Sequence, residues 1–353
     1  MFPVAKISLD CVKTFAVSRH GKISFSFLKE NGELLAIANS IGLALPDNAL
    51  ELYEELYEKI DKLCYLYPPF YRFFMAIALD LEDLGMPGRK GEELLDYVVK
   101  HNFYTADTSD TRRMEIINLL ARRDRLPNFG MDSQESLFER VIAFLEQTER
   151  FIKFNRPLFY DVTHLVFYIT NYGINPIPQS DKILQSLNHI GMLAYLDNDI
   201  ELISEVCLCY AFLKHPVPEL WFKASQTGLR NIDVSYIDPE DVRSSPPADD
   251  YHIYFVNSWL MGLSGKEALH ESYKNIGVPI FTYHKNVKST LSKIFQVLHP
   301  IILEQSSAKP PRPLKALEFL SVEDTIHLQT ALSSSASGDK FLYELTNGHI
   351  SLG

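Results

Sequence analysis

Cysteine and glycine are scarce in this sequence of 353 residues. The four cysteines, at positions 11, 64, 207 and 209, include no Cys-x-x-Cys pair. We therefore expect neither a disulfide framework nor a structural zinc site. Only 16 residues are glycine, whereas 22 are phenylalanine and 18 are tyrosine. This composition favours packed helices with aromatic side chains between them over a turn-rich β fold.

Positive charge and long apolar runs are lacking as well. The 34 Lys and Arg residues are outnumbered by 45 Asp and Glu residues, so the formal net charge is −11. An acidic chain of this kind is not expected to bind nucleic acid. No uninterrupted apolar run reaches the roughly 18 residues that a membrane span needs. The opening residues, "MFPVAKISLD", do not have the pattern of a secretory signal, and we expect a cytoplasmic protein.

Several sequence motifs for common chemistries are absent. There is no Gly-x-x-x-x-Gly-Lys loop and no Gly-x-Gly-x-x-Gly loop, so no nucleotide cofactor is expected. There is also no Gly-x-Ser-x-Gly nucleophile elbow. An acidic "DLED" at 80–83 and a basic cluster within 112–125 are interpreted as solvated helix surfaces.

Two periodicities divide the sequence into two predicted domains. Residues 4–38 alternate between apolar and polar side chains and contain Asn31-Gly32, a strong hairpin signal. They predict a short antiparallel β meander within a domain of residues 1–48. From residue 49 to residue 353 the apolar residues recur with a helical period, and loops are expected near 228–248 and 305–315. The later predicted helices lie near 158–171, 180–196, 199–214, 218–226, 249–263, 265–275, 287–304, 321–333 and 338–346.

Three acidic residues recur at a fixed interval in the helical part. Asp161, Glu205 and Asp249 are 44 residues apart, and each lies in or at the start of a predicted helix. A period of this length fits one helical hairpin per repeat. We therefore predict a mainly α fold of α/α hairpin repeats that form a toroid or a curved solenoid, preceded by the β meander.

Histidines accompany two of these acids at helical spacing. His164 follows Asp161 by three positions, and His252 follows Asp249 in the same way, so each pair shares one helix face. Together with Glu205, these four side chains are the predicted catalytic centre. The surrounding aromatic residues are predicted to bind the substrate. They are Tyr160, Tyr168, Tyr251, Tyr254, Phe255 and Trp259.

Three interpretations of this centre remain open. It is a metal-free acid/base site in an aromatic pocket, or a metal site in which Asp161, His164, Glu205, Asp249 and His252 hold two iron ions or another divalent metal. In the second case Glu115 or Glu139 would supply a further carboxylate, and the short aspartate side chains would require close helices. In the third interpretation, each aspartate caps a helix and each histidine is a core residue.

One stretch resembles a known sequence signature. "YDVTHLVFYITNYG" is similar to Tyr-x-x-Thr-His-x-x-Phe-Tyr-x-Thr-Asp-x-Gly, found in a family of uncharacterised bacterial helical proteins, except that Asn171 replaces the Asp. The resemblance covers about 14 residues. It implies an α/α-toroid-like fold and a context in bacterial specialised metabolism, and it implies no particular activity.

Together these observations favour an enzyme whose class the sequence leaves undefined. The first hypothesis is an acid/base enzyme, similar to a cyclase or an isomerase, that acts on an apolar or aromatic small molecule in biosynthesis. The second is a dinuclear metal-dependent oxygenase. The third is a non-catalytic helical-repeat scaffold that binds a partner. Oligomeric state is not predicted.

Overall fold

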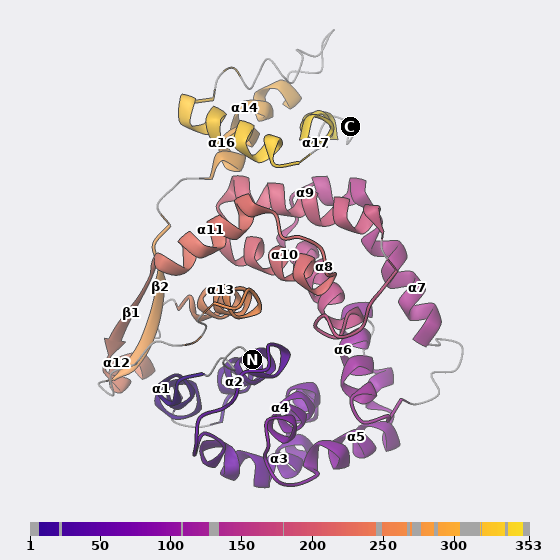
Figure 1. The fold of residues 1–353 in the computed structure, drawn as a ribbon, viewed down its shortest axis with the longest axis vertical. Coiled ribbons are helices and arrows are strands. Elements are labelled where there is room, and N and C mark those ends of the chain that lie inside the picture. Colours follow the sequence, from indigo (N-terminus) through magenta and orange to yellow (C-terminus); the bar gives the residue numbers. More distant parts are fainter. Residues whose placement is uncertain are drawn as a thin grey trace. The chain divides into compact units, whose positions relative to one another are not determined.

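The chain divides into two compact units, each built from two segments. Unit 1 contains residues 1–137 and 229–283, and unit 2 contains residues 138–228 and 284–353. Both are mainly helical (Figure 1). The computed structural model describes residues 7–20, 23–106, 109–126, 134–178, 180–244, 249–266, 269, 277–285, 289–303, 318, 320–335 and 338–348.

The predicted N-terminal β meander is wrong, because the described part of residues 7–40 is helical. It forms α1 (Leu9–Lys13), a π-helical turn (Thr14–Ser18) and α2 (Phe25–Ser40). Ser24 begins α2, where its Oγ atom accepts a hydrogen bond from the backbone N–H of Phe27. Figure 1 shows this segment in indigo.

Tertiary contacts explain why the hairpin signal at Asn31-Gly32 fails. Asn31 is fully buried in α2, where its Nδ2 atom donates to the carbonyl oxygens of Phe15 and Phe27 and its Oδ1 atom accepts from the hydroxyl of Tyr53. These three bonds satisfy the amide only in the helical conformation. The buried residues also follow a helical period rather than an alternating one: Phe27, Leu28, Asn31, Leu34, Leu35 and Ala38.

The other helices of unit 1 pack around α2 and α4. α4 lies against α2, α3 and α5, which places Phe74, Met75 and Ile77 in the core. Short 3-10 turns connect the helices at Leu50–Tyr53, Pro68–Phe70 and Phe103–Thr105. The helices are α3 (Glu54–Leu66), α4 (Tyr71–Asp83), α5 (Lys90–Lys100), α6 (Asp110–Ala121), α12 (Pro239–Ser244) and α13 (Tyr251–Leu263).

A two-stranded antiparallel sheet completes unit 1. β1 (Ile232–Ile237) pairs with β2 (Val278–Tyr283), and the register joins Ile232 to Tyr283 and Ile237 to Val278. Gly277 precedes β2 with φ +92°, and a Cβ atom there would lie 2.6 Å from the carbonyl oxygen of Ile237, so a side chain would be excluded. Much of the predicted loop at 228–248 is therefore ordered structure.

Unit 2 is built around α9, which packs against α10, α14 and α16. Asn155 caps α8, because its Oδ1 atom accepts from the N–H of Leu158, and Asp199 caps α10 through the N–H of Leu202. Two helices, α7 (Gln134–Leu145) and α11 (Glu219–Arg230), contain residues of both units. The others are α8 (Arg156–Ile169), α9 (Asp181–Asp197), α10 (Ile200–Phe212), α14 (Thr290–Leu303), α16 (Val322–Ser333) and α17 (Gly338–Gly348).

The mainly helical fold class is thus confirmed, and the small antiparallel sheet lies in a different place from the one predicted. The boundaries between the units follow residues 137, 228 and 283, and none of them coincides with the predicted domain boundary at residue 48. The toroid or solenoid arrangement stays a prediction. The predicted loop at 305–315 and most of the predicted helix at 265–275 lie outside the described residues. Within the described part of the chain, no helix has the length and apolarity that a membrane span requires.

Candidate active site

A row of aromatic side chains with a histidine in it runs along α8 in unit 2. Tyr160, His164 and Tyr168 follow one another at intervals of four residues, the spacing that places side chains on one helix face, and Tyr172 extends the row just after α8 ends at Ile169. Their ring centroids are 6.2, 6.2 and 6.3 Å apart in succession. All four residues are half-buried. α8 thus presents a ring-rich strip that contains an imidazole.

Glu205 of α10 lies beside this strip and is buried. Its side chain is only 1% exposed, and its Oε1 atom lies 3.9 Å from the Nε2 atom of His164. The hydroxyl of Thr163 donates a hydrogen bond of 2.5 Å to its Oε2 atom. The thiol of Cys209 lies one turn further along α10, and burial, together with the charge of Glu205, raises its pKa well above the usual value.

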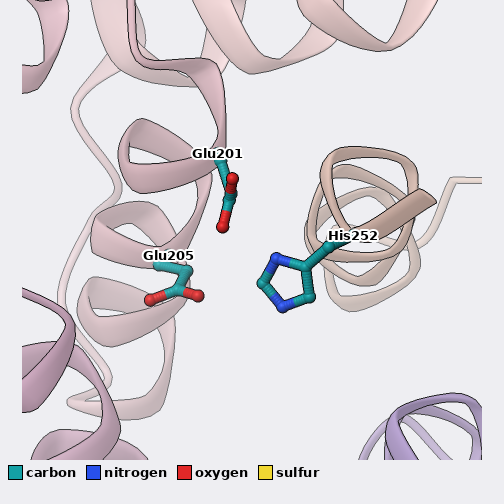
Figure 2. Close-up of side chains that lie close together, drawn as sticks. All are labelled: Glu201, Glu205 and His252. Atoms are coloured by element: carbon teal, nitrogen blue, oxygen red, sulfur yellow. The ribbon is translucent and has the colours of Figure 1, made fainter. Parts of the chain in front are cut away.

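A second carboxylate lies one turn before Glu205 on the same face of α10 (Figure 2). The carboxylate oxygens of Glu201 and Glu205 come within 4.8 Å of each other. Arg156 holds this end of α10, since its Nη2 atom lies 3.1 Å from Glu201 and its Nε atom 2.6 Å from Asp199. Arg156 therefore compensates the negative charge at the N-terminal end of α10.

Tyr160 connects the aromatic strip to these carboxylates. The guanidinium of Arg156 lies 5.0 Å from the centre of the Tyr160 ring. Burial and the nearby charges of Glu205 and Asp199 raise the pKa of Tyr160. Its hydroxyl oxygen is buried, and the side chain of Glu201 lies near it. Tyr160 thus stays protonated and can donate a hydrogen bond to a bound group.

The other predicted acid and base residues, Asp249 and His252, belong to unit 1. Asp249 precedes α13, where its Oδ1 atom accepts from the N–H groups of Tyr251 and Phe281. Its Oδ2 atom pairs with Arg19. Burial raises the pKa of Asp249 more than the ion pair with Arg19 lowers it. In this unit Asp249 therefore joins α13 to β2 and to the N-terminal segment.

His252, the third side chain drawn in Figure 2, has a carboxylate neighbour in its own unit that the sequence pattern did not indicate. Its Nε2 atom lies 3.7 Å from Oε1 of Glu33 on α2. Burial raises the pKa of Glu33, although the charge of His252 opposes this effect. Glu33 was missed because its segment was predicted to be β structure.

The aromatic residues predicted to bind substrate fall into two groups. Tyr160 and Tyr168 are part of the strip on α8, whereas the others are on α13 in unit 1. Phe255 is fully buried with its ring 4.5 Å from that of Phe15, and the Tyr254 ring lies 4.9 Å from Phe281. Trp259 is 7% exposed, and Tyr251 lies under the guanidinium of Arg19 at 5.4 Å. This second group contributes to the core of unit 1.

The interval of 44 residues does not correspond to equivalent helix positions. Asp161 is in the middle of α8 and exposed, Glu205 is in the middle of α10 and buried, and Asp249 lies before the first residue of α13. Of the five predicted catalytic residues, unit 2 brings together His164 and Glu205, which are 41 positions apart.

His164, Glu205 and Glu201 have side chains of the type that binds divalent metals. Two atoms that share one ion at about 2.1 Å each are at most about 4.2 Å apart, and the 3.9 Å between His164 and Glu205 satisfies this limit. Of the two predicted fourth carboxylates, Glu115 is paired with Arg72 at 3.2 Å in unit 1, and Glu139 is exposed on α7. His164 and Glu205 therefore meet the distance limit for one shared ion, and the dinuclear centre stays a prediction.

Two polar clusters were not anticipated from the sequence. In unit 2, the hydroxyl of Thr290 lies 3.0 Å from Oδ1 of Asp324 and 2.9 Å from Nδ1 of His327. A third Asp-x-x-His pair is thus hydrogen-bonded to one buried hydroxyl group. In unit 1, the "DLED" and basic segments are not separate solvated surfaces. Asp80 is 3% exposed and pairs with Arg122 at 2.8 Å. The signal that could have found this pair is the opposite charge of the two segments.

Comparison with models of protein families identifies the family of this chain. A family model described as "Domain of unknown function (DUF6902)" matches residues 5–347. The chain belongs to this family. No curated protein matches it, and no solved structure does. Membership in the DUF6902 family agrees with the expected resemblance to an uncharacterised family. The 14-residue signature and the bacterial origin stay predictions.

Proposed function

We propose that this member of the DUF6902 family is an enzyme that moves protons on an apolar or aromatic small molecule, using His164 and Glu205 of unit 2. The observation that supports this most strongly is the position of Glu205. It is almost fully buried in the middle of α10 between apolar neighbours, yet an imidazole lies 3.9 Å away.

A buried carboxylate is costly for folding unless it is paired and hydrogen-bonded. Moving an isolated charge into a protein interior is strongly unfavourable. A carboxylate has about four acceptor sites, and the hydroxyl of Thr163 occupies one of those of Glu205. An apolar residue of similar size at position 205 would remove this cost. The presence of an acid at this position therefore supports a chemical role.

The surrounding side chains support separate roles in proton transfer. His164 has a 39% exposed side chain, so its imidazole can reach a substrate and act as the proton carrier. Glu205 orients that imidazole and stabilises its charged form. Tyr160 donates a hydrogen bond to an oxygen of the substrate, since its raised pKa keeps it protonated. General acid/base catalysis of this kind accelerates a reaction by about 10²–10⁴-fold.

The substrate class follows from the strip on α8. Half-buried rings at Tyr160, Tyr168 and Tyr172 provide flat apolar surface next to the His164 imidazole. Such a surface binds conjugated, terpenoid-like or aromatic molecules, and the ring faces stabilise positive charge that develops during a cyclisation or an isomerisation. We also propose that the reaction takes place in the cytoplasm, in bacterial specialised metabolism.

Metal-assisted chemistry is the second candidate, and the distance between His164 and Glu205 is the observation that favours it. An ion held by these two residues, with Glu201 one turn away, would keep open positions for water or substrate. It would supply Lewis-acid activation of a bound oxygen. Metal analysis of protein purified without a chelator separates the two candidates. A stoichiometric ion that disappears in Glu205→Gln supports the metal site, and its absence from the wild-type protein leaves the acid/base proposal.

Deuterium incorporation from heavy water tests the acid/base proposal whatever the chemical identity of the product. Terpenoid, polyene and aromatic compounds are incubated with the protein in D₂O and followed by mass spectrometry. We expect incorporation that falls by at least about 10²-fold in both His164→Gln and Glu205→Gln. The matched controls, Glu219→Gln and His215→Gln, change an exposed and a half-buried residue of unit 2 and should keep the wild-type rate.

Two outcomes would contradict this proposal. In one, His164→Gln retains the full exchange rate for every compound that the wild-type protein converts. In the other, no compound exchanges, while both variants lose thermal stability and still bind whatever partner chain the wild-type protein binds. The second outcome would favour a helical scaffold, in which Glu205 and His164 are only core residues.

A further inference from the structure

Unit 1 contains a cavity that is separate from the residues of the proposed active site. It has a volume of about 360 Å³ and lies where the 3-10 turn Pro68–Phe70, the first turn of α4, the turn Phe103–Thr105 and α6 meet. Its size falls in the range of small-molecule sites, about 300–1,000 Å³. The lining includes Pro68, Pro69, Tyr71, Arg72, Phe103 and Arg112.

The backbone around this cavity has little freedom to rearrange. Pro68 and Pro69 have fixed φ angles, and they form the corner at which α3 ends and α4 begins. On the opposite side, Asn102 adopts a left-handed conformation with φ 54°, which reverses the chain after α5 and presents Phe103. Walls of this kind are already formed before a ligand arrives, which lowers the entropy lost on binding.

Aromatic rings continue from the cavity to the surface of unit 1. The ring of Phe103 lies 5.7 Å from Tyr71 at 72° and 5.4 Å from Tyr97 at 80°, and both angles are those of edge-to-face packing. The Tyr97 ring in turn lies 4.5 Å from Tyr65. Tyr65, Leu66 and Tyr67, which directly precede the two prolines, are 50%, 71% and 54% exposed. An exposed apolar group of this size next to a cavity is typical of a binding surface.

Positive charge lines the same cavity, although the chain as a whole carries a net charge of −11. Arg72 lies in the first turn of α4, 3.2 Å from the carboxylate of Glu115, so its charge is partly compensated. Arg112 is exposed in the first turn of α6. A planar guanidinium matches the two oxygens of a carboxylate or a sulfonate and also stacks on rings.

Rings, prolines and guanidinium groups at one cavity select a ligand that is both flat and anionic. We propose that unit 1 binds a small aromatic anion here, a planar ring system that carries a carboxylate or a sulfonate. The ring packs against Tyr71 and Phe103, and Arg112 pairs with the anionic group. This site does not depend on the proposed reaction at His164 and Glu205.

Two fluorescent probes with the same rings test this proposal on the full-length protein. Anilinonaphthalene sulfonate carries the anionic group, and N-phenylnaphthylamine is its neutral counterpart. We expect the sulfonate to bind saturably, with one probe per chain, and at least about tenfold more tightly than the neutral probe. The Arg112→Gln variant should weaken the sulfonate at least tenfold and leave the neutral probe unchanged. Because Arg112 is exposed, this change should not disturb the fold, and a thermal melt checks that.

Two further variants make the test specific for the cavity. Phe103→Ala should weaken both probes, because it removes ring surface rather than charge. Lys62→Gln, an exposed residue of α3 outside the cavity lining, removes the same charge as Arg112→Gln and should leave both probes unchanged. Saturable binding that is the same in wild-type, Arg112→Gln and Phe103→Ala protein would place the probe elsewhere and overturn the proposal. Failure of the sulfonate to saturate would overturn it as well.

Discussion

Replacing Arg19 with methionine should destabilise unit 1 strongly. The side chain of Arg19 is 5% exposed. Its Nε atom donates to Glu30 at 2.7 Å, its Nη2 atom pairs with Asp249, and its Nη1 atom donates to the carbonyl oxygen of Pro279 at 2.5 Å. One guanidinium thus connects α2, the start of α13 and β2, which belong to the two separate segments of this unit.

The size of the effect follows from what methionine leaves behind. Methionine fills a similar volume, but it removes the cation that pairs with buried Glu30 and half-buried Asp249 and leaves Glu30 with His20 alone. Removing one partner of a buried ion pair costs about 3–5 kcal/mol, which is a large part of the roughly 5–15 kcal/mol typical of a folded domain. The triple variant that also carries Glu30→Gln and Asp249→Asn should recover most of the loss, because no unpaired charge then remains.

The loss should also depend on pH in a defined direction. Burial raises the pKa of Glu30, but hydrogen bonds from His20 and Arg19 outweigh it and hold the pKa below its ordinary value of 4.5. The stability that Glu30 contributes in the wild-type protein is thus present above this value and is lost as the pH falls through the lowered pKa. In Arg19→Met the carboxylates favour protonation instead, so the difference from wild type should shrink as the pH falls from about 7 towards about 4.

Urea unfolding followed by circular dichroism at several pH values measures these effects. Arg89→Met serves as the control, because Arg89 forms an exposed ion pair with Glu92 at 2.6 Å, and such pairs contribute little. If unfolding shows two transitions, only one should shift. A loss below about 1 kcal/mol at neutral pH, or one that does not change with pH, would refute the role given to this buried network.

Three further predictions concern unit 2. Gly191→Ala should lower the unfolding free energy by about 1–3 kcal/mol, because a Cβ atom would lie 2.5 Å from the Trp221 ring. Tryptophan fluorescence during urea unfolding measures this loss, and an unchanged urea midpoint would contradict the close packing of Gly191 on Trp221. Thr163→Val should lower the unfolding free energy by about 1–3 kcal/mol, because it removes the hydroxyl that donates to buried Glu205. Thr163→Ser keeps the hydroxyl and should lower it less. Equal urea midpoints for the two variants would contradict this prediction. Burial lowers the pKa of His189, so the stability it contributes is present above its ordinary pKa of 6.5 and is lost as the pH falls. His189→Gln should therefore flatten the dependence of the melting temperature on pH between about 7 and about 5, and an unchanged slope would exclude the effect.

The sequence predicted the helices of unit 2 well because their signals are local. Residues 158–171, 180–196 and 199–214 were expected to be helical, and α8, α9 and α10 cover 156–169, 181–197 and 200–212. Apolar residues at helical spacing mark the length of each helix, and the side chains of Asn155 and Asp199 cap α8 and α10, respectively. These features involve residues only three or four positions apart.

The N-terminal segment and the sheet were misplaced because distant residues decide them. The Asn31-Gly32 pair looks like a turn until its buried amide finds Tyr53, which is 22 residues away. β1 forms only because β2 lies antiparallel to it, and the paired residues Ile237 and Val278 are 41 positions apart. Neither partner can be inferred from the local alternation of side chains.

The same distinction holds for the charged groups. The sequence alone singled out His164 and Glu205, the first by its Asp-x-x-His spacing and the second by its interval of 44 residues from Asp161 and Asp249. It paired His164 with Asp161, since residues three apart are neighbours on a helix, whereas the tertiary structure pairs it with Glu205 from another helix. Helix positions follow from backbone bonds between residues four apart. The partner of a buried charge follows from which helix faces meet, and only the folded chain decides that.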